Sequence, residues 1–172
     1  MKQTIKIVYS KYYFDEVIKK MLDFSKKNLS GYNLIITEVP GSFEIPFEIA
    51  RSIKQDYQEE FQVNFKKEEK EKRNLRDNIV QMAKLSQLNL ADKSLYSGFL
   101  ALGCIIKGKT INHEAISTSI FTNLQRISVE NIIPIGNGIF NANSLEEAKN
   151  KNIKCTQQAL KVLEKLLIPK EK

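Results

Sequence analysis

The 172 residues of this chain are enough for one domain with a substantial core, and a hydrophobic content of 42% with nine phenylalanines is typical of a globular protein. A net charge of +7 raises the question of nucleic acid, but the lysines are mixed with glutamates and lack the interleaved aromatic residues of a single-strand binder. Because no apolar run approaches the ~18 residues of a membrane helix, we expect a cytoplasmic protein that binds neither nucleic acid nor membrane.

The first part of the chain alternates strand and helix patterns. Residues 4–9 form a short β-branched run that predicts a strand, and residues 10–13 form the turn after it. Apolar positions over 14–29 follow helical spacing, which predicts an amphipathic helix that Gly31 terminates. Residues 33–39 predict the second strand. Since a helix connects the two strands, they should be parallel.

A turn with the sequence VPGSFEIP follows this second strand, over residues 39–46. Proline and glycine form the turn, Glu44 stands between apolar neighbours, and Pro46 opens the next helix. Glu44 has two interpretations. It is either an acid that complements the helix macrodipole or a hydrogen-bond acceptor for a polyhydroxyl ligand.

Residues 54–93 differ in character from the rest of the chain. The run over 66–73 is too charged to pack on a core, so it forms a solvated face or a mobile excursion. Apolar residues from Leu75 to Leu88 then recur at steps of three and four, which predicts an amphipathic helix that covers a sheet edge or a neighbour's surface. We therefore expect a single domain over residues 1–172 with a charged helical insertion at about 54–93.

The stretch over 99–113, FLALGCIIKGKTINH, is where we expect the active site. Its apolar start is typical of a central parallel strand; periodicity alone also permits a buried helix, but its length and glycines favour the strand. Ligands of open α/β sheets bind beyond the carboxyl ends of the strands. This end carries Lys107, Lys109, Thr110 and His113, and lysines, a hydroxyl and the N–H groups of a helix start together attract phosphate.

A helix, a strand and a long final helix complete the pattern. Apolar residues over 116–127 recur at helical spacing, and residues 132–139, IIPIGNGI, predict a strand whose carboxyl end is polar and rich in glycine. Ser144 and Glu147 form a capping box, which predicts a helix through residue 167. The alternation predicts a three-layer α/β/α fold around a four-stranded parallel sheet.

The two cysteines give no sign of a metal site. Cys104 falls in the central strand and Cys155 in the last helix, and the pair forms neither a metal-ligand spacing nor a disulfide framework. We interpret both as buried free thiols and expect no metal.

Three stretches together resemble the lumazine synthases, which catalyse the penultimate step of riboflavin biosynthesis. They are residues 39–46, 101–110 and 133–139, the last followed by the helix start Ser-Leu-Glu-Glu-Ala. Their order and spacing match from residue 5 to 167, with 54–93 as an extra piece. The resemblance implies a flavodoxin-like domain in a homo-oligomer, a pentamer or larger shell, with active sites between subunits.

The activity implied by the resemblance is a condensation without a cofactor. 5-Amino-6-(D-ribitylamino)uracil and 3,4-dihydroxy-2-butanone 4-phosphate would give 6,7-dimethyl-8-ribityllumazine, phosphate and water. The residues that would hold the uracil substrate, through side chains or backbone, are Tyr12, Ser42, Phe43, Glu44, Cys104, Ile105, Ile106 and Asn137. Among them Tyr12 would stack on the pyrimidine and Glu44 would bind the ribityl hydroxyls, while Lys109 and Thr110 would hold the phosphate.

The chain departs from the family at two places. The family's histidine stands two residues after the threonine, where this chain has Asn112, and His113 is one residue later, a rotation of ~100° on a helix. Either the turn is longer and His113 reaches the pocket, or His113 faces solvent or a neighbouring subunit and proton transfer is lost or taken by another group. In place of a phosphate-binding arginine the chain offers Lys149, Lys151 and Lys154, of which Lys151 matches best, and lysine makes a point contact where arginine makes a fork.

Two other functions are compatible with these patterns. One is a catalytically weakened assembly subunit that keeps the fold and the contacts of the shell. The other is a flavodoxin-like binder of flavin or nucleotide, because the same alternation supports it. Ser42, Glu44, Lys109 and Thr110 favour the enzyme, whereas Asn112 favours the assembly subunit.

Overall fold

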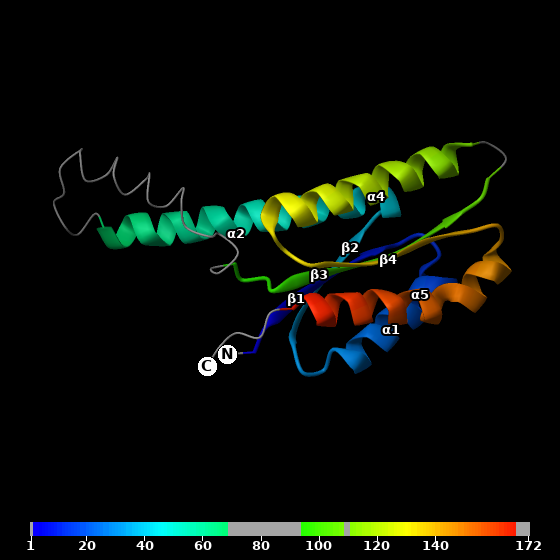
Figure 1. Ribbon diagram of the computed structural model, residues 1–172, viewed down its shortest axis with the longest axis horizontal. Coiled ribbons are helices and arrows are strands. Elements are labelled where there is room, and N and C mark those ends of the chain that lie inside the picture. Colours follow the sequence, from blue (N-terminus) through cyan, green and yellow to red (C-terminus); the bar gives the residue numbers. More distant parts are fainter. Residues whose placement is uncertain (1, 69–93, 109–110, 168–172) are drawn as a thin grey trace.

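A computed structural model describes residues 2–68, 94–108 and 111–167 of the chain (Figure 1). One parallel sheet runs through it, with the strand order β2-β1-β3-β4. Its strands are β1 (Thr4–Ser10), β2 (Asn33–Val39), β3 (Gly98–Ile106) and β4 (Ile135–Ala142). The sheet confirms the predicted number, direction and approximate positions of the strands.

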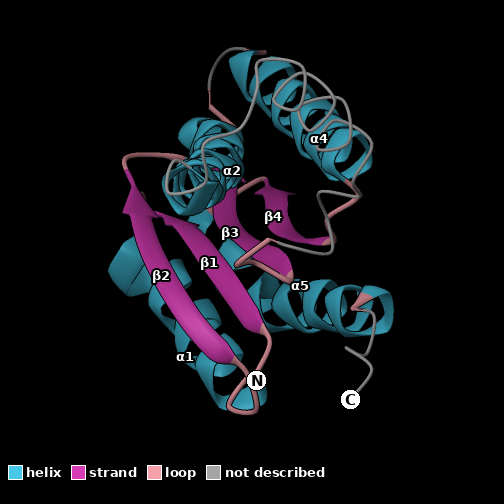
Figure 2. Cartoon of the chain, turned by 90° about the vertical axis from the view of Figure 1, so that its left-hand side faces the viewer, coloured by secondary structure: helices cyan, strands magenta, loops and turns pink. Residues whose placement is uncertain are grey.

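Helices cover both faces of the sheet (Figure 2). They are α1 (Lys19–Asn28), α2 (Ile45–Glu68), α4 (Asn112–Asn131) and α5 (Leu145–Leu166), with a π-helical turn η1 (Phe14–Ile18) before α1 and a 3-10 turn η2 (Ser42–Glu44) before α2. α1 and α5 share one core cluster with the sheet, and α2 and α4 share the other. This confirms the three-layer α/β/α fold. Within the described ranges no helix has the length and hydropathy of a membrane span.

β3 is buried on both faces, which explains its apolar sequence without alternation. Leu100 and Leu102 pack into the cluster of α1 and α5, while Phe99 and Ala101 pack into the cluster of α2 and α4. A strand between two other strands and two helix layers has no side that faces water. The structure therefore confirms the strand over the alternative of a buried helix.

The first helix differs slightly from its prediction. It starts with the π-helical turn at Phe14 and ends at Asn28, where the N–H of Leu29 donates to the Ser25 carbonyl. The helix therefore ends before Gly31, and Gly31 has no positive φ, so it forms no left-handed cap.

β4 begins three residues later than predicted, which changes the place of its glycines. Ile132 ends α4 in a left-handed conformation (φ 52°), and the Pro134 carbonyl accepts a 2.9 Å hydrogen bond from the Phe99 N–H of β3. Gly136 then lies inside the strand, where a Cβ would be 2.8 Å from the Ala159 carbonyl oxygen of α5. The strand is thus confirmed over 135–139, but the prediction that it ends in glycines is wrong, because Gly136 lies inside it and admits the close approach of α5.

The predicted insertion at about 54–93 begins within α2, which continues without a break beyond residue 54. The amphipathic helix predicted over 75–88 lies outside the described residues. At the root of the segment, Asp56 Oδ2 accepts hydrogen bonds of 2.7 Å from both the Ser94 hydroxyl and the Leu95 N–H. One carboxylate thus joins the two ends of the segment.

Candidate functional site

Two of the predicted site residues meet at Gly41, beyond the carboxyl end of the sheet. A Cβ built on Gly41 would lie 3.0 Å from Glu44 Oε2 and 3.3 Å from Cδ2 of the Tyr12 ring. The turns that carry the two side chains are joined by a 2.8 Å hydrogen bond from the Lys11 N–H to the Val39 carbonyl. The structure therefore brings a carboxylate and an aromatic ring, far apart in sequence, to one place.

Local backbone geometry sets the direction of Tyr12. The buried Ser10 hydroxyl accepts a 3.2 Å hydrogen bond from the Tyr12 N–H, and the next residue, Tyr13, is left-handed with φ 57° and ψ 34°. Such a conformation is uncommon for a bulky side chain and tightens the turn. Tyr12 is 67% exposed, so its side chain is accessible to a ligand.

Ser42 supplies a buried hydroxyl beside this pair. Its Oγ is enclosed and has no hydrogen-bond partner among the residues that the structure describes. A buried hydroxyl without a partner costs stability, and a ligand atom or a water that reached it would remove that cost. The neighbouring Phe43 is 58% exposed. The turn η2 thus presents one hidden polar group and one open apolar group.

The carboxyl end of β3 offers a free backbone edge. β1 pairs with β3 only as far as Tyr9 and Leu102, whereas β4 continues to pair up to Ile106 and Ala142. The residues after Leu102, which include the predicted Cys104, Ile105 and Ile106, therefore extend past the ladder with β1. Backbone groups on that side have no strand beside them and can bind a planar polar ring.

The Cys104 side chain itself points into the core. Burial, with a contribution from nearby Cys155, raises the pKa of the Cys104 thiol to about 12. Both cysteines are free, as predicted, but only Cys104 is buried, because Cys155 is partly exposed on α5. Cys104 thus stays a protonated thiol at neutral pH and serves as core, and only its backbone is available to a substrate. Within the described ranges no three His, Cys, Asp or Glu side chains are grouped as a metal site.

His113 and Asn112 open α4 in different environments. The His113 side chain is 13% exposed and its Nε2 lies 3.8 Å from Glu114 Oε1, while Asn112 is exposed. α4 also packs against η2, the turn that carries Ser42 and Glu44. Of the two residues, the histidine is the more enclosed. Lys109 and Thr110, the predicted phosphate ligands, lie outside the described residues.

Asn137 lies in the middle of β4, away from the carboxyl end of the sheet where Tyr12 and Glu44 meet. It pairs with Ala101 and stands five residues, roughly 17 Å, before the end of β4 at Ala142. Its side-chain oxygen accepts a 3.0 Å hydrogen bond from the Ile139 N–H of its own strand. The later start of β4 is the reason for this shift. Its place in a substrate pocket stays a prediction.

Lys151 is engaged on the surface of α5. It forms an ion pair with Glu147, whose carboxylate also accepts a 2.6 Å hydrogen bond from the Asn143 N–H, and Ser144 caps the helix by accepting from the Glu147 N–H. These contacts, first among them the one from Lys151, lower the pKa of Glu147 to about 2. The charge of Lys151 therefore already has a partner within its own helix.

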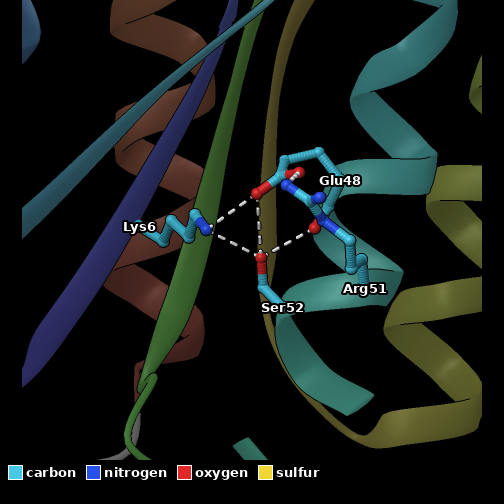
Figure 3. A network of polar contacts seen from close by, with 4 residues as sticks. All are labelled: Lys6, Glu48, Arg51 and Ser52. Atoms are coloured by element: carbon cyan, nitrogen blue, oxygen red, sulfur yellow. Dashed lines mark hydrogen bonds and ion pairs between the residues drawn. The ribbon is translucent and has the colours of Figure 1, made fainter. Parts of the chain in front are cut away.

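A buried ion pair that the sequence analysis missed connects β1 to α2 (Figure 3). Lys6 Nζ lies 2.9 Å from Glu48 Oε1 and 2.8 Å from Ser52 Oγ, and Arg51 pairs with the second Glu48 oxygen. Burial alone would raise the pKa of Glu48, but the hydrogen bond and charge of Lys6, together with Arg51, lower it. A lysine between isoleucines in a buried strand was the signal for this pair.

Sequence comparison connects these features to known proteins. Residues 77–167, more than half of the chain, match the family profile described as 6,7-dimethyl-8-ribityllumazine synthase. The match contains β3, α4, β4 and α5, and it begins inside the stretch that we predicted as an insertion, so the bounds of that insertion stay a prediction.

Relatives with this name align over most of the chain. The 6,7-dimethyl-8-ribityllumazine synthase of Blochmanniella pennsylvanica is 27% identical over 169 residues, which are 94% of this chain and 83% of the relative. The one of Buchnera aphidicola subsp. Baizongia pistaciae is 29% identical over 152 residues, 86% of this chain and 72% of the relative. The one of Afipia carboxidovorans is 29% identical over 138 residues, 79% of this chain and 64% of the relative.

Proposed function

The chain belongs to the 6,7-dimethyl-8-ribityllumazine synthase family, and we propose that it is a transferase of riboflavin biosynthesis that makes the lumazine itself. In this reaction 5-amino-6-(D-ribitylamino)uracil condenses with 3,4-dihydroxy-2-butanone 4-phosphate, and phosphate and water leave. No cofactor takes part. The observation that carries the proposal is the meeting of Tyr12, Glu44 and the unpartnered Ser42 hydroxyl beside the free edge of β3.

These groups match the parts of the uracil substrate. The exposed Tyr12 ring offers a stacking face for the pyrimidine, and the backbone edge after Leu102 offers donors and acceptors to its polar rim. Glu44, as a carboxylate, accepts charge-assisted hydrogen bonds from the ribityl hydroxyls. Lys109, Thr110 and the amino end of α4 would hold the phosphate of the second substrate.

The chemistry then needs mostly positioning and proton transfer. The amine of the uracil condenses with the ketone once the two are oriented, and phosphate leaves from the carbon next to an acidified position. A histidine can carry the protons of these steps, and His113 is the enclosed candidate at the start of α4. Asn112, an exposed amide, would at most orient a substrate.

We further propose a homo-oligomer, a pentamer or a larger shell, with active sites between subunits. Two large apolar side chains four residues apart are exposed, Phe43 in η2 at 58% and Phe47 in the first turn of α2 at 68%, and Tyr12 is exposed as well. Large apolar groups in such a row are typical of an interface. In this arrangement Asn137 would line the site of a neighbouring subunit. Two free thiols fit a cytoplasmic protein.

The decisive experiment incubates the purified full chain with both substrates and measures lumazine by mass spectrometry. The proposal expects product at a rate well above the spontaneous condensation, dependent on both substrates. Oligomers without product would favour the weakened assembly subunit, for which the exposed Asn112 at the family's histidine position is the specific observation. Tight flavin binding without product would favour the flavodoxin-like binder.

A further inference from the structure

The Lys6–Glu48 pair has a geometry that apolar packing alone does not supply. α2 lies on the sheet mainly through Ile45, Ile49 and Ile53, whose contacts are non-directional and tolerate small rotations of the helix. The hydrogen bonds from Lys6 to Glu48 and Ser52 are directional, and both acceptors belong to α2. They fix the rotation of α2 and its position along β1.

Stability is a weak reason for such a pair. Lys6 and Glu48 are 7% and 4% exposed, so both ions lose most of their hydration on folding. Replacement of a buried pair by apolar residues of similar size is often neutral or stabilising, and the best-attested use of buried polar groups is to specify one packing register. The pair is therefore better explained by the position that it enforces.

That position is transmitted directly to the candidate site. η2 continues into α2 without interruption, with the Ile45 N–H bonded to the Ser42 carbonyl, and Glu44 stands one turn before Glu48. A side-chain tip lies about 5–6 Å from a helix axis, so a rotation of ~10° moves it by about 1 Å. A misplacement of that size at a reacting group can cost about 10²-fold in rate.

We propose that Lys6 and Glu48 are positioning residues that hold α2 so that Ser42 and Glu44 face the uracil substrate. The inference rests on the proposed function, because it gives Glu44 a ligand. Ser52 takes part as the second acceptor for Lys6, and Arg51 holds the far oxygen of Glu48. None of these four residues needs to contact the substrate.

The test separates position from stability with two opposite variants of the full chain. The double variant Lys6→Met with Glu48→Leu should keep the melting temperature, yet bind 5-amino-6-(D-ribitylamino)uracil about tenfold more weakly in calorimetry. Glu48→Gln keeps an acceptor for Lys6 but removes the counter-charge, so it should melt lower and bind within about twofold of wild type. If the pair served stability alone, the affinity for the uracil substrate would change in parallel with the melting temperature in both variants.

The matched control removes an ion pair on another helix. Arg126→Gln with Glu130→Gln deletes the exposed pair of α4, 3.9 Å long, and should change neither melting nor binding. Uracil binding by the double variant at wild-type strength would overturn the inference. If the double variant does not fold, Ser52→Ala decides: about threefold weaker binding supports the inference, and unchanged binding overturns it.

Failure of the proposed function gives a different result. In that case the wild type itself does not bind the uracil substrate, and hydrogen exchange of residues 41–45, followed by mass spectrometry, tests the positioning without a ligand. Faster exchange there in the double variant than in the α4 control supports the inference. Equal exchange in the two overturns it.

Discussion

The Ser42 hydroxyl occupies the space in which residue 103 would need a side chain. A Cβ on Gly103 would lie 2.5 Å from Ser42 Oγ and 3.2 Å from Ile139 Cγ1. The turn η2 thus packs directly against the backbone of β3. This contact determines how closely Ser42 approaches the sheet and therefore where η2 lies in the candidate site.

Gly103→Ala should disturb both the fold and the site. The added methyl group meets Ser42 and Ile139, and overpacking of this kind costs about 1–3 kcal/mol of unfolding free energy. Binding of the uracil substrate should weaken as Ser42 is displaced. Urea unfolding and calorimetry measure the two effects. Gly31→Ala is the control, because a Cβ there meets nothing within 4 Å; equal stability of the two variants would contradict the role of Gly103.

Glu44→Gln should weaken binding of the uracil substrate by ~1.5 to 3 kcal/mol, because the charge-assisted hydrogen bonds to the ribityl hydroxyls are lost. The fold should remain intact, since Glu44 is only half-buried at the end of η2. Calorimetry on the folded variant gives the value. Glu146→Gln, an exposed acid in the first turn of α5, is the control. Unchanged affinity would exclude a ribityl-binding role for Glu44.

His113→Ala should lower the rate by about 10²- to 10⁴-fold with little change in substrate affinity, the range for loss of general acid-base help. Asn112→Ala should matter less, because its side chain is exposed whereas that of His113 is enclosed. Steady-state kinetics with both substrates distinguish the two. The double exchange Asn112→His with His113→Phe restores the family's spacing. If the wild type is nearly inactive and this exchange creates strong activity, His113 is not the catalytic residue.

Excision of residues 60–88, bridged by a short glycine-serine linker, should preserve the oligomer and its activity. Asp56 already binds Ser94 and Leu95, so the described residues on the two sides of the segment are held together without the excised part. A shorter loop also costs less closure entropy. Size-exclusion chromatography and the lumazine assay report the outcome. Insoluble monomer would instead indicate that the removed segment packs on the sheet or on a neighbour.

The amino end of α5 should lose stability in acid. The pKa of Glu147 is lowered in the folded chain from its ordinary 4.5 to about 2, so its contribution is complete above about pH 4.5 and disappears as the pH falls through about 2. Glu147→Gln should therefore flatten the decline of the unfolding free energy between these values. Urea unfolding at several pH values measures the slope. Glu146→Gln should leave it unchanged, and an equal effect of both variants would contradict the assignment.

Contiguous patterns in the sequence were sufficient for the architecture. The β-branched run of β1, the apolar run of β3 and the helix start at Ser144 each depend on neighbouring residues. The structure confirms both strands and the Ser144 cap, although the Glu147 carboxylate accepts from the Asn143 N–H and not from Ser144. The spacing of apolar residues indicates which faces of a strand or helix are covered. It can therefore be interpreted without knowing which other element packs on that face. The same holds for the motif around Glu44, whose turn residues specify a helix start.

Contacts between distant residues were decided only by the tertiary structure. Lys6 and Glu48 are 42 residues apart, and their pairing depends on how α2 crosses β1. The glycine at 136 looked like the end of a strand, but it lies inside β4 because α5 packs there. In both cases the structural role of the residue depends on a helix that follows later in the chain. Packing geometry between elements, which no local pattern encodes, made that choice.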